Sequence, residues 1–211
     1  WVEHARFAHS DAPSLTPPEG AALATSADVD QVCEAFASIV DAKSSFTAEH
    51  SSRVTQYAML LGELRGADPE RLTTLRRAAL LHDLGKLGVS NAILDKPGRL
   101  TDDEFAQVKA HPRYSYEILS RIKGFERIAE IAANHHERLD GTGYWRGLSE
   151  EALDEDMRIL AAADVYDALT AARPYRGAME HDDAIALMNE GRGTALDLSL
   201  IHISEPTRPE R

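Results

Sequence analysis

The sequence predicts an all-α fold, and three observations support this prediction. From Val29 onward, apolar residues recur at spacings of three and four, the period of an amphipathic helix. Helix-start signals follow: Asp68 precedes Pro69, and Thr101 stands three residues before Glu104 in the pattern of a capping box. No segment alternates β-branched and polar residues over a length that would form a sheet.

The N-terminal part of the chain divides into a segment without periodicity and two expected helices. Residues 1–28 contain three prolines and no sustained apolar pattern, so we expect a linker or the end of an upstream module. The first helix is expected from Val29 and the second over about residues 48–65. The residues expected on their buried faces are Val32, Phe36, Ile39 and Val40 in the first helix, and Val54, Ala58, Leu61 and either Leu60 or Leu64 in the second.

Further helices are expected as far as about residue 190. A third runs from Pro69 to His82, and a fourth begins after Thr101. Residues 191–211 break the pattern and look like a translated cloning sequence, so the expected domain covers residues 29–190, followed by an atypical tail. The other expected helices lie around Ile118, Leu119 and Ile122, over Phe125–Glu137, over Met157–Ala171 and over about residues 181–190, with a turn-rich stretch at Leu139–Leu148.

Composition limits the classes of function. Lys and Arg number 23 and Asp and Glu 35, a formal net charge of −12, which argues against binding of a nucleic acid polymer. An anionic substrate would need a local reversal of this field, and bound metal ions supply one. No apolar run approaches the roughly 20 residues that span a bilayer. The single cysteine, Cys33, excludes an intramolecular disulfide and fits the reducing cytoplasm, where we expect the protein to act.

The stretch HDLGK at residues 82–86 places an imidazole, a carboxylate and an ammonium where the apolar run of the third helix ends. It belongs to a set of five histidines and two aspartates, each on an expected helix or near a helix end. Imidazole and carboxylate bind Fe, Mn, Zn or Co, and helical bundles commonly build di-metal sites from facing helices. We therefore expect seven metal ligands: His50, His82, Asp83, His111, His135, His136 and Asp164.

The spacing of these residues favours two metal ions over one. Adjacent residues such as His82 and Asp83 lie about 100° apart around a helix, so they can serve two ions side by side, with Asp83 as the bridging ligand. His135 and His136 repeat the arrangement. A single His-Asp pair is common on protein surfaces, but two paired sites in one helical chain indicate a binuclear centre.

The same residues resemble a known family. HDLGK, then His111, then HHERLDGTGY from His135 and DVYDALTAARPYR from Asp164 look like the HD-GYP branch of the HD phosphohydrolases, over about Asp41–Arg176. Members of this branch are all-helical phosphodiesterases that open cyclic di-GMP, and they act as output domains behind a sensor or receiver module. The resemblance implies an HD-domain helical bundle with a buried di-metal site, and an upstream module of that kind.

The resemblance also implies a role for each matching residue. Two divalent transition metal ions, Fe or Mn, would be held by four residues each, with one residue shared. Lys86 would contact the phosphate that is cleaved, and Asp167 would orient a histidine. Tyr144, Arg173 and Arg176 would bind the substrate, the two arginines through its phosphates. One ion would take His50, His82, Asp83 and Asp164, and the other Asp83, His111, His135 and His136.

Two positions depart from the family pattern. The signature GYP reads Gly143-Tyr144-Trp145 here. Because proline stiffens a turn, we expect Trp145 to give a freer loop with an exposed aromatic ring that tunes activity or partner docking. Family members with a third metal ion carry Glu one turn before the first histidine, where this chain has Phe46, so we expect two ions only.

Together these residues predict a signalling phosphodiesterase that hydrolyses cyclic di-GMP to linear pGpG. Further hydrolysis to GMP stays open, as do pairing in a homodimer and docking of a GGDEF-type cyclase or another signalling protein. One alternative is an HD phosphohydrolase that acts on another cyclic dinucleotide, such as cyclic GMP-AMP, or on a nucleotide. The other is an inactive relative that docks partner proteins, which Trp145 favours and the complete ligand set opposes.

Overall fold

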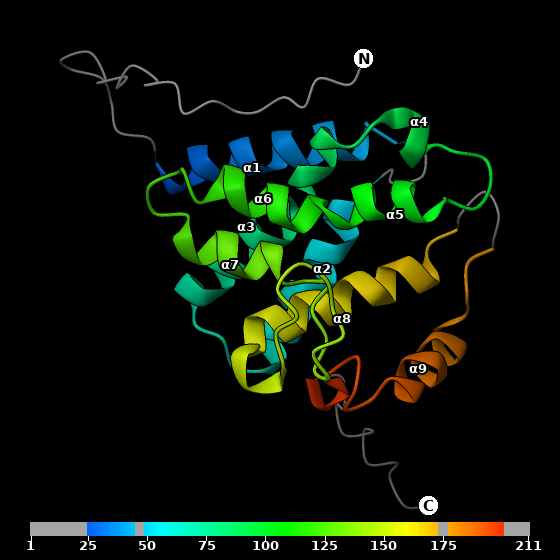
Figure 1. The fold of residues 1–211 in the computed structure, drawn as a ribbon. Coiled ribbons are helices and arrows are strands. Elements are labelled where there is room, and N and C mark those ends of the chain that lie inside the picture. The colour runs from blue at the N-terminus through cyan, green and yellow to red at the C-terminus, as the bar shows by residue number, and fades with distance from the viewer. Residues whose placement is uncertain (1–24, 45–48, 173–176, 201–211) are drawn as a thin grey trace, which may run out of the picture.

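The computed structural model describes residues 25–44, 49–172 and 177–200, drawn in colour in Figure 1. Within these ranges the chain is helical, with two isolated β-bridges and no strand, so the predicted all-α class is confirmed. No helix in the described part of the chain is both long and apolar enough to cross a membrane. The α-helices are α1 (Ser26–Asp41), α2 (His50–Leu64), α3 (Pro69–Leu81), α4 (Asn91–Leu94), α5 (Asp102–Lys109), α6 (His111–Leu119), α7 (Glu126–Ala133), α8 (Glu155–Thr170) and α9 (His181–Glu190), and the 3₁₀ helices are η1 (Leu84–Gly88), η2 (Glu150–Ala152) and η3 (Leu198–Leu200).

Local sequence fixes where most of these helices start. α1 begins inside the stretch predicted as a linker, because Thr25 and Asp28 form a capping box in which the Asp28 carboxylate accepts the Thr25 N–H at 2.8 Å. α3 and α5 start as predicted, after Asp68 and Thr101. Asp154 caps α8, because its carboxylate accepts the backbone N–H groups of Asp156 and Met157.

α1 buries a different face from the one predicted. It packs against α3 through small side chains, Cys33 and Ala37, which let the two helices approach closely. An ion pair between Asp30 and Arg77, 2.7 Å apart, flanks this contact. The expectation that the largest apolar residues face inward was therefore wrong for most of the helix. Val32, Phe36 and Ile39 are exposed, whereas Val40 is buried as predicted.

Other apolar residues that mark helices in the sequence are also exposed. α2 lies between α3 and α8, and it buries the compact side chains of Val54 and Ala58 as predicted, with Leu61 packed partly against the core. Leucines of this helix that do not face the core are exposed to solvent in the described structure. The exposed residues are Leu60 and Leu64 of α2 and Ile118 and Ile122 of the α6 region, whereas Leu119 is buried.

The core lies where α2, α3, α7 and α8 meet, as Figure 1 shows with α8 crossing α2. Its largest fully buried side chains include Leu75 of α3, Ile131 of α7 and Ile159 and Leu160 of α8. Burial of each such side chain contributes roughly 1.5–3 kcal/mol. This apolar centre fixes the helices rigidly, so the polar residues at their ends are held in fixed relative positions.

The first ten residues of the atypical tail pack on the domain. Leu196 and Leu198 are buried with Met188 of α9 against Ala161 and Ala162 of α8. The chain between α9 and η3 therefore closes the outer side of α8 in the described structure.

Candidate metal centre

The HDLGK stretch leaves α3 and runs directly against α6. A Cβ added at Gly85 would lie 1.9 Å from the carbonyl oxygen of His111, so only glycine fits here. Ser115 fixes the contact: the Gly85 N–H donates to Ser115 Oγ at 2.8 Å, and that hydroxyl donates to the His82 carbonyl at 2.8 Å. The glycine of the motif thus brings His82 and Asp83 beside the start of α6.

Three histidines are oriented in the same way by backbone carbonyls. The Nδ1 atoms of His82, His111 and His135 lie 2.7, 2.7 and 2.6 Å from the carbonyl oxygen three residues earlier. A carbonyl only accepts, so each Nδ1 carries the proton and each Nε2 keeps a free lone pair. For His82 and His135 the acceptor belongs to the last turn of a helix, where carbonyls lack an intrahelical partner.

Asp83 is buried between two groups of histidines. Its Oδ2 lies 3.6 Å from Nε2 of His50 and 3.6 Å from Nε2 of His82. Its Oδ1 lies 3.2 Å from Nε2 of His111 and 3.9 Å from Nε2 of His135. Because the two carboxylate oxygens face different histidines, the geometry suits the bridging position predicted for Asp83.

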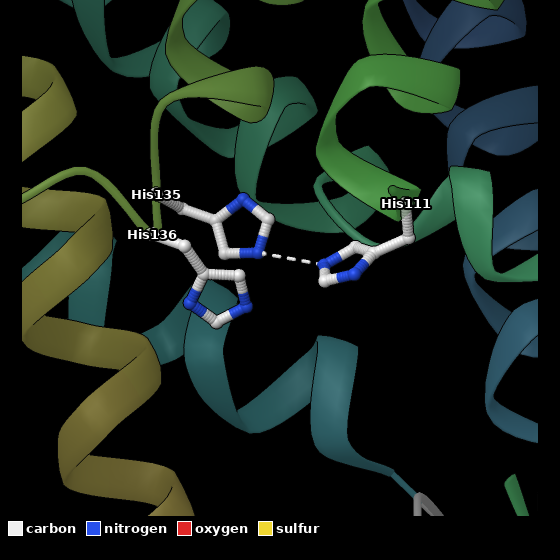
Figure 2. Close-up of side chains that lie close together, drawn as sticks. All are labelled: His111, His135 and His136. Atoms are coloured by element: carbon white, nitrogen blue, oxygen red, sulfur yellow. Dashed lines mark hydrogen bonds between the residues drawn. The ribbon is translucent and has the colours of Figure 1, made fainter. Parts of the chain in front are cut away.

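The second group of histidines is drawn in Figure 2, where the rings of His111, His135 and His136 converge from the start of α6 and the end of α7. Their nearest ligand atoms all lie within 4.8 Å of one another. The Nε2 atoms of His111 and His135 are 3.2 Å apart. Because the Nδ1 atom of each ring already faces a backbone carbonyl, the two Nε2 atoms are the ones left to share a cation there.

Two aspartates one turn apart on α8 hold His50 from both sides of its ring. Asp164 Oδ1 lies 3.4 Å from His50 Nε2, and Asp167 Oδ2 lies 2.7 Å from His50 Nδ1. Asp167 also accepts from Arg53 Nε at 2.6 Å. Asp167 therefore occupies the place expected of a residue that orients a metal-binding histidine. At the N-terminus of α2, Asp41 accepts the backbone N–H of the residue after His50 and so fixes where that helix begins.

The donor set fits metal ions. Within the described residues, His82 Nε2 and Asp83 Oδ1 are buried and have no hydrogen-bond partner. Unpaired buried polar atoms are rare and costly, and a metal ion held between these residues would satisfy both. Three groups have ligand atoms within 4.8 Å of one another: His50 with His82 and Asp164, His82 with Asp83 and His135, and His111 with His135 and His136.

Burial keeps several of these imidazoles neutral and ready to bind a cation. Burial lowers the pKa of His82, and burial together with the neighbouring histidines lowers the pKa of His135 well below its ordinary value. Burial also lowers the pKa of His136 to about 3. Neutral imidazole is the form that binds metals, so no proton has to leave these three rings.

The carboxylates and His50 are charged in the metal-free protein. Burial opposes ionisation of Asp83, but the adjacent Lys86 ammonium favours it, and the pKa of Asp83 stays well below its usual range. Burial likewise opposes protonation of His50, but Asp164 and Asp167 raise the pKa of His50 to about 10. Without a bound cation, His50 thus carries a positive charge among aspartates.

Lys86, predicted to contact the phosphate that is cleaved, lies at the edge of this centre. Its Nζ is 2.5 Å from Asp83 Oδ2, and its side chain is partly exposed. Phe46, Arg173 and Arg176 lie outside the described residues, so the predictions about a third ion and about the phosphate-binding arginines stay predictions.

The loop after α7 is held beside the second histidine group by Glu137. This buried carboxylate accepts the backbone N–H groups of residues 146–148 at 2.8, 3.3 and 2.9 Å. A Cβ added at Gly143 would lie 2.5 Å from Glu137 Cα, so the loop closes onto Glu137 only with glycine there. Tyr144 then stacks on His136, with ring centroids 4.7 Å apart and planes inclined by 34°.

The prediction that Trp145 is exposed was wrong. Trp145 is half-buried, and its ring centroid lies 5.1 Å from that of Tyr116 on α6. The Arg146 guanidinium covers both rings, 4.1 Å from the Trp145 centroid and 4.7 Å from the Tyr116 centroid. Trp145 has a φ of +96°, which proline cannot adopt because its ring fixes φ near −65°.

Sequence reasoning identified Asp167 but missed the other residues that support the ligands. Arg53 stands three residues after His50, one helical turn on, and this spacing is a usable signal for a shared partner. Ser115 and Glu137 gave no signal of their own, because their roles depend on which backbone groups the fold brings to them.

Comparison with known proteins agrees with this geometry. A family model described as the HD domain matches residues 34–200. The 3′3′-cGAMP-specific phosphodiesterase 3 of Vibrio cholerae is 48% identical, over 87% of this chain and 40% of that protein. The cyclic di-GMP phosphodiesterase response regulator RpfG of Xanthomonas campestris is 41% identical, over 77% of this chain and 43% of that protein.

A solved structure of the cyclic GMP-AMP specific phosphodiesterase V-cGAP3 of V. cholerae matches with a TM-score of 0.55 and 39% identity, covering 91% of this chain and 45% of that one. The chain thus spans less than half the length of these relatives. With the family match, the helical fold and the motif order in agreement, the chain belongs to the HD domain family, in its HD-GYP branch.

Proposed function

We propose that the protein is a metal-dependent phosphodiesterase that opens a cyclic dinucleotide by hydrolysis. One observation carries the proposal: the two oxygens of the buried Asp83 face the Nε2 atoms of two separate groups of histidines. Centres with two ions suit phosphodiester cleavage, because they stabilise both the attacking and the leaving oxygen. The mixed imidazole and carboxylate donors favour Fe or Mn.

The residues of the chain have separate tasks in this proposal. Two bound divalent ions supply a water of lowered pKa and positive charge for the phosphate. Asp83 stays ionised because its pKa is low, so it binds cations without competing protonation. Lys86 pairs with the buried Asp83 but is itself partly exposed, so its ammonium can leave the carboxylate and stabilise a non-bridging phosphate oxygen. Asp167 and Arg53 keep His50 in one orientation.

Cyclic di-GMP, opened to linear pGpG, is the substrate predicted from the sequence, and the name of the relative RpfG supports it. A cyclic dinucleotide presents two phosphates across its ring, one for the metal centre and one for Arg173 and Arg176. The aromatic face of Tyr144 beside His136 offers a surface on which a purine can stack.

Cyclic GMP-AMP is the second candidate substrate. Two relatives from V. cholerae, 48% and 41% identical, bear the name 3′3′-cGAMP-specific phosphodiesterase. Both candidates share the 3′–5′ linkage and one guanine, so the same centre and the same cationic residues serve either. The choice depends on how the second base is recognised.

We further propose that the domain acts in the cytoplasm as the output of a longer signalling protein, because it spans about 40% of the relatives and one of these is named a response regulator. Its upstream part would be a sensor or receiver module. Pairing in a homodimer and docking of a GGDEF-type cyclase remain predictions from the sequence.

The test is turnover by protein purified without oxygen and loaded with Mn²⁺ or Fe²⁺. Cyclic di-GMP and cyclic GMP-AMP are supplied separately, and products are identified by mass spectrometry. We expect the wild type to form a linear dinucleotide and Asp83→Ala to form no product. Asp156→Asn should keep full turnover, because the buried Asp156 lies at the start of α8, away from the metal centre. Protein that holds two ions per chain but opens neither dinucleotide would contradict the proposal and favour a docking role.

A further inference from the structure

We propose that Trp145 is a positioning residue: with Tyr116 and Arg146 it forms an aromatic stack that holds Tyr144 against His136 and thereby orients this metal-binding histidine. The inference rests on the proposed function only in assigning His136 to a metal ion.

His136 differs from the other candidate ligands in how its ring is held. His82, His111 and His135 each donate Nδ1–H to a backbone carbonyl, and His50 lies 2.7 Å from Asp167. Within the described residues, the ring of His136 makes no such hydrogen bond, and its Nδ1 lies 3.8 Å from the Asp164 carboxylate. Its orientation therefore depends on the rings packed against it.

Tyr144 is the ring that covers His136 from the loop side. Their centroids are 4.7 Å apart with the planes inclined by 34°, and the Tyr144 backbone N–H donates to the His136 carbonyl at 3.4 Å. The Lys109 ammonium lies over the Tyr144 ring, 5.5 Å from its centroid. The other rings packed on His136 are His135 and His111, with centroids 4.0 and 5.1 Å away, so a displacement of Tyr144 would leave His136 in contact only with other candidate ligands.

The position of Tyr144 is set by the residue that follows it. Trp145 packs on Tyr116 of α6, and Arg146 covers both rings while its guanidinium pairs with Glu130 of α7 at 2.6 Å. The stack therefore connects the loop to α6, which begins with His111, and to α7, which ends just before His135 and His136. On the inner side, Glu137 holds the backbone of the same loop.

The backbone at Trp145 shows that these contacts determine the loop conformation. A φ of +96° is rare for any residue with a side chain and unfavourable for a bulky one. Such a conformation persists only where surrounding contacts hold it. In the family pattern a proline would stiffen this turn, but proline cannot adopt this φ, so here packing of the indole replaces the rigid ring.

The experiment measures metal binding at the two halves of the centre separately from turnover. Trp145→Gly removes the indole and accepts the positive φ, so it deletes the stack without straining the backbone. Trp145→Phe keeps an aromatic ring in the stack. Arg138→Ala is the matched control, because Arg138 lies in the same loop and pairs with the exposed Asp140. Mn²⁺ affinity is measured by competition with a fluorescent chelator and stoichiometry by elemental analysis.

We expect Trp145→Gly to weaken binding of one of the two Mn²⁺ ions by about 10- to 100-fold, the range typical of lost ligand support, and to leave the other unchanged. Trp145→Phe should lose less than Trp145→Gly, and Arg138→Ala should match the wild type. Two Mn²⁺ bound with wild-type affinity by Trp145→Gly would overturn the proposal. If Trp145→Gly does not fold, Tyr116→Leu removes the other ring of the stack from outside the loop and is judged by the same criteria.

Trp145 also reports its own environment. Trp1 and Trp145 are the two tryptophans of the chain, so in a Trp1→Phe background the indole fluorescence comes from position 145 alone. Arg146→Ala uncovers the indole and should shift its emission to longer wavelength and weaken the same Mn²⁺ ion. A shift in emission without a change in metal affinity would show that the stack is formed but does not orient His136. Because no arm requires a cyclic dinucleotide, failure of the proposed reaction leaves this test intact.

Discussion

Replacing Asp167 with asparagine should weaken one metal ion and leave the fold in place. Asp167 is 1% exposed and accepts from His50 Nδ1 at 2.7 Å and from Arg53 Nε at 2.6 Å. The amide has the same shape but no charge, and its single oxygen can accept from one of these donors while its NH₂ meets the other. His50 thus loses either its orienting bond or the charge that strengthens it.

The expected loss of metal affinity follows from the position of Asp167 behind the metal-binding His50. Loss of a carboxylate behind a metal-binding histidine typically weakens metal affinity about 10- to 100-fold, or roughly 1.4–2.7 kcal/mol. His50 belongs to the group with His82 and Asp164, so only the ion held by that group should be affected. Loss of the carboxylate charge also weakens the bonds from Arg53 to position 167, which adds a stability loss of about 1–3 kcal/mol.

Asp156→Asn is a matched control for the stability loss. Asp156 lies on the same helix, is 5% exposed, and likewise accepts from two basic side chains, here Arg71 Nε at 2.7 Å and Arg127 Nη2 at 2.9 Å. Both variants should lower the thermal midpoint of the metal-free protein by several degrees, since about 1 kcal/mol corresponds to roughly 2–4 °C at this size. Only Asp167→Asn should lose Mn²⁺ affinity in a chelator competition. Equal metal affinity in the two variants would refute the idea that Asp167 orients a ligand.

Three further predictions follow from the centre and its supports. Gly85→Ala should abolish binding of both ions and lower the thermal midpoint strongly, because the added Cβ would meet the His111 carbonyl oxygen at 1.9 Å; a folded variant with full metal content by elemental analysis would contradict the close approach of η1 and α6. Asp83→Ala should lower metal content at both halves of the centre, whereas His50→Ala should lower it chiefly at one, and an Asp83→Ala protein with two ions per chain would exclude the bridging role. Metal binding should release at least one proton per chain at neutral pH, since His50 has a raised pKa of about 10 and must lose its Nε2 proton. Affinity for that ion should therefore rise as pH increases towards 10, and calorimetry in buffers of different ionisation enthalpy that detected no release would contradict this.

The helices and the grouping of the candidate ligands could be predicted because both leave a local signal. Asp68 with Pro69 and Thr101 with Glu104 mark helix starts through capping, and those starts agree with α3 and α5. His82 beside Asp83 at the end of an apolar run indicates a polar cavity at that helix end. The structure brings these residues together with His50, His111, His135, His136 and Asp164.

What could not be predicted depends on contacts between distant segments. The buried face of α1 was assigned by side-chain size, but close packing on α3 selects Cys33 and Ala37 instead of Phe36. The prediction for Trp145 considered only the missing stiffness of proline. The contacts of Trp145 with the Tyr116 ring on α6 and with the Arg146 guanidinium could not be predicted in this way. Ser115 and Glu137 bind backbone groups, and the sequence alone does not show which backbone groups the fold will bring to them.

The most direct test of the account is the fate of solvent oxygen during turnover. Metal-loaded protein is incubated in H₂¹⁸O with an equimolar mixture of cyclic di-GMP and cyclic GMP-AMP, and the products are weighed by mass spectrometry. The account predicts linear dinucleotides with a single ¹⁸O on the newly formed terminal phosphate, because each cleavage transfers one activated water to phosphorus. Two intact cyclic dinucleotides after incubation with protein that retains two ions per chain would contradict it.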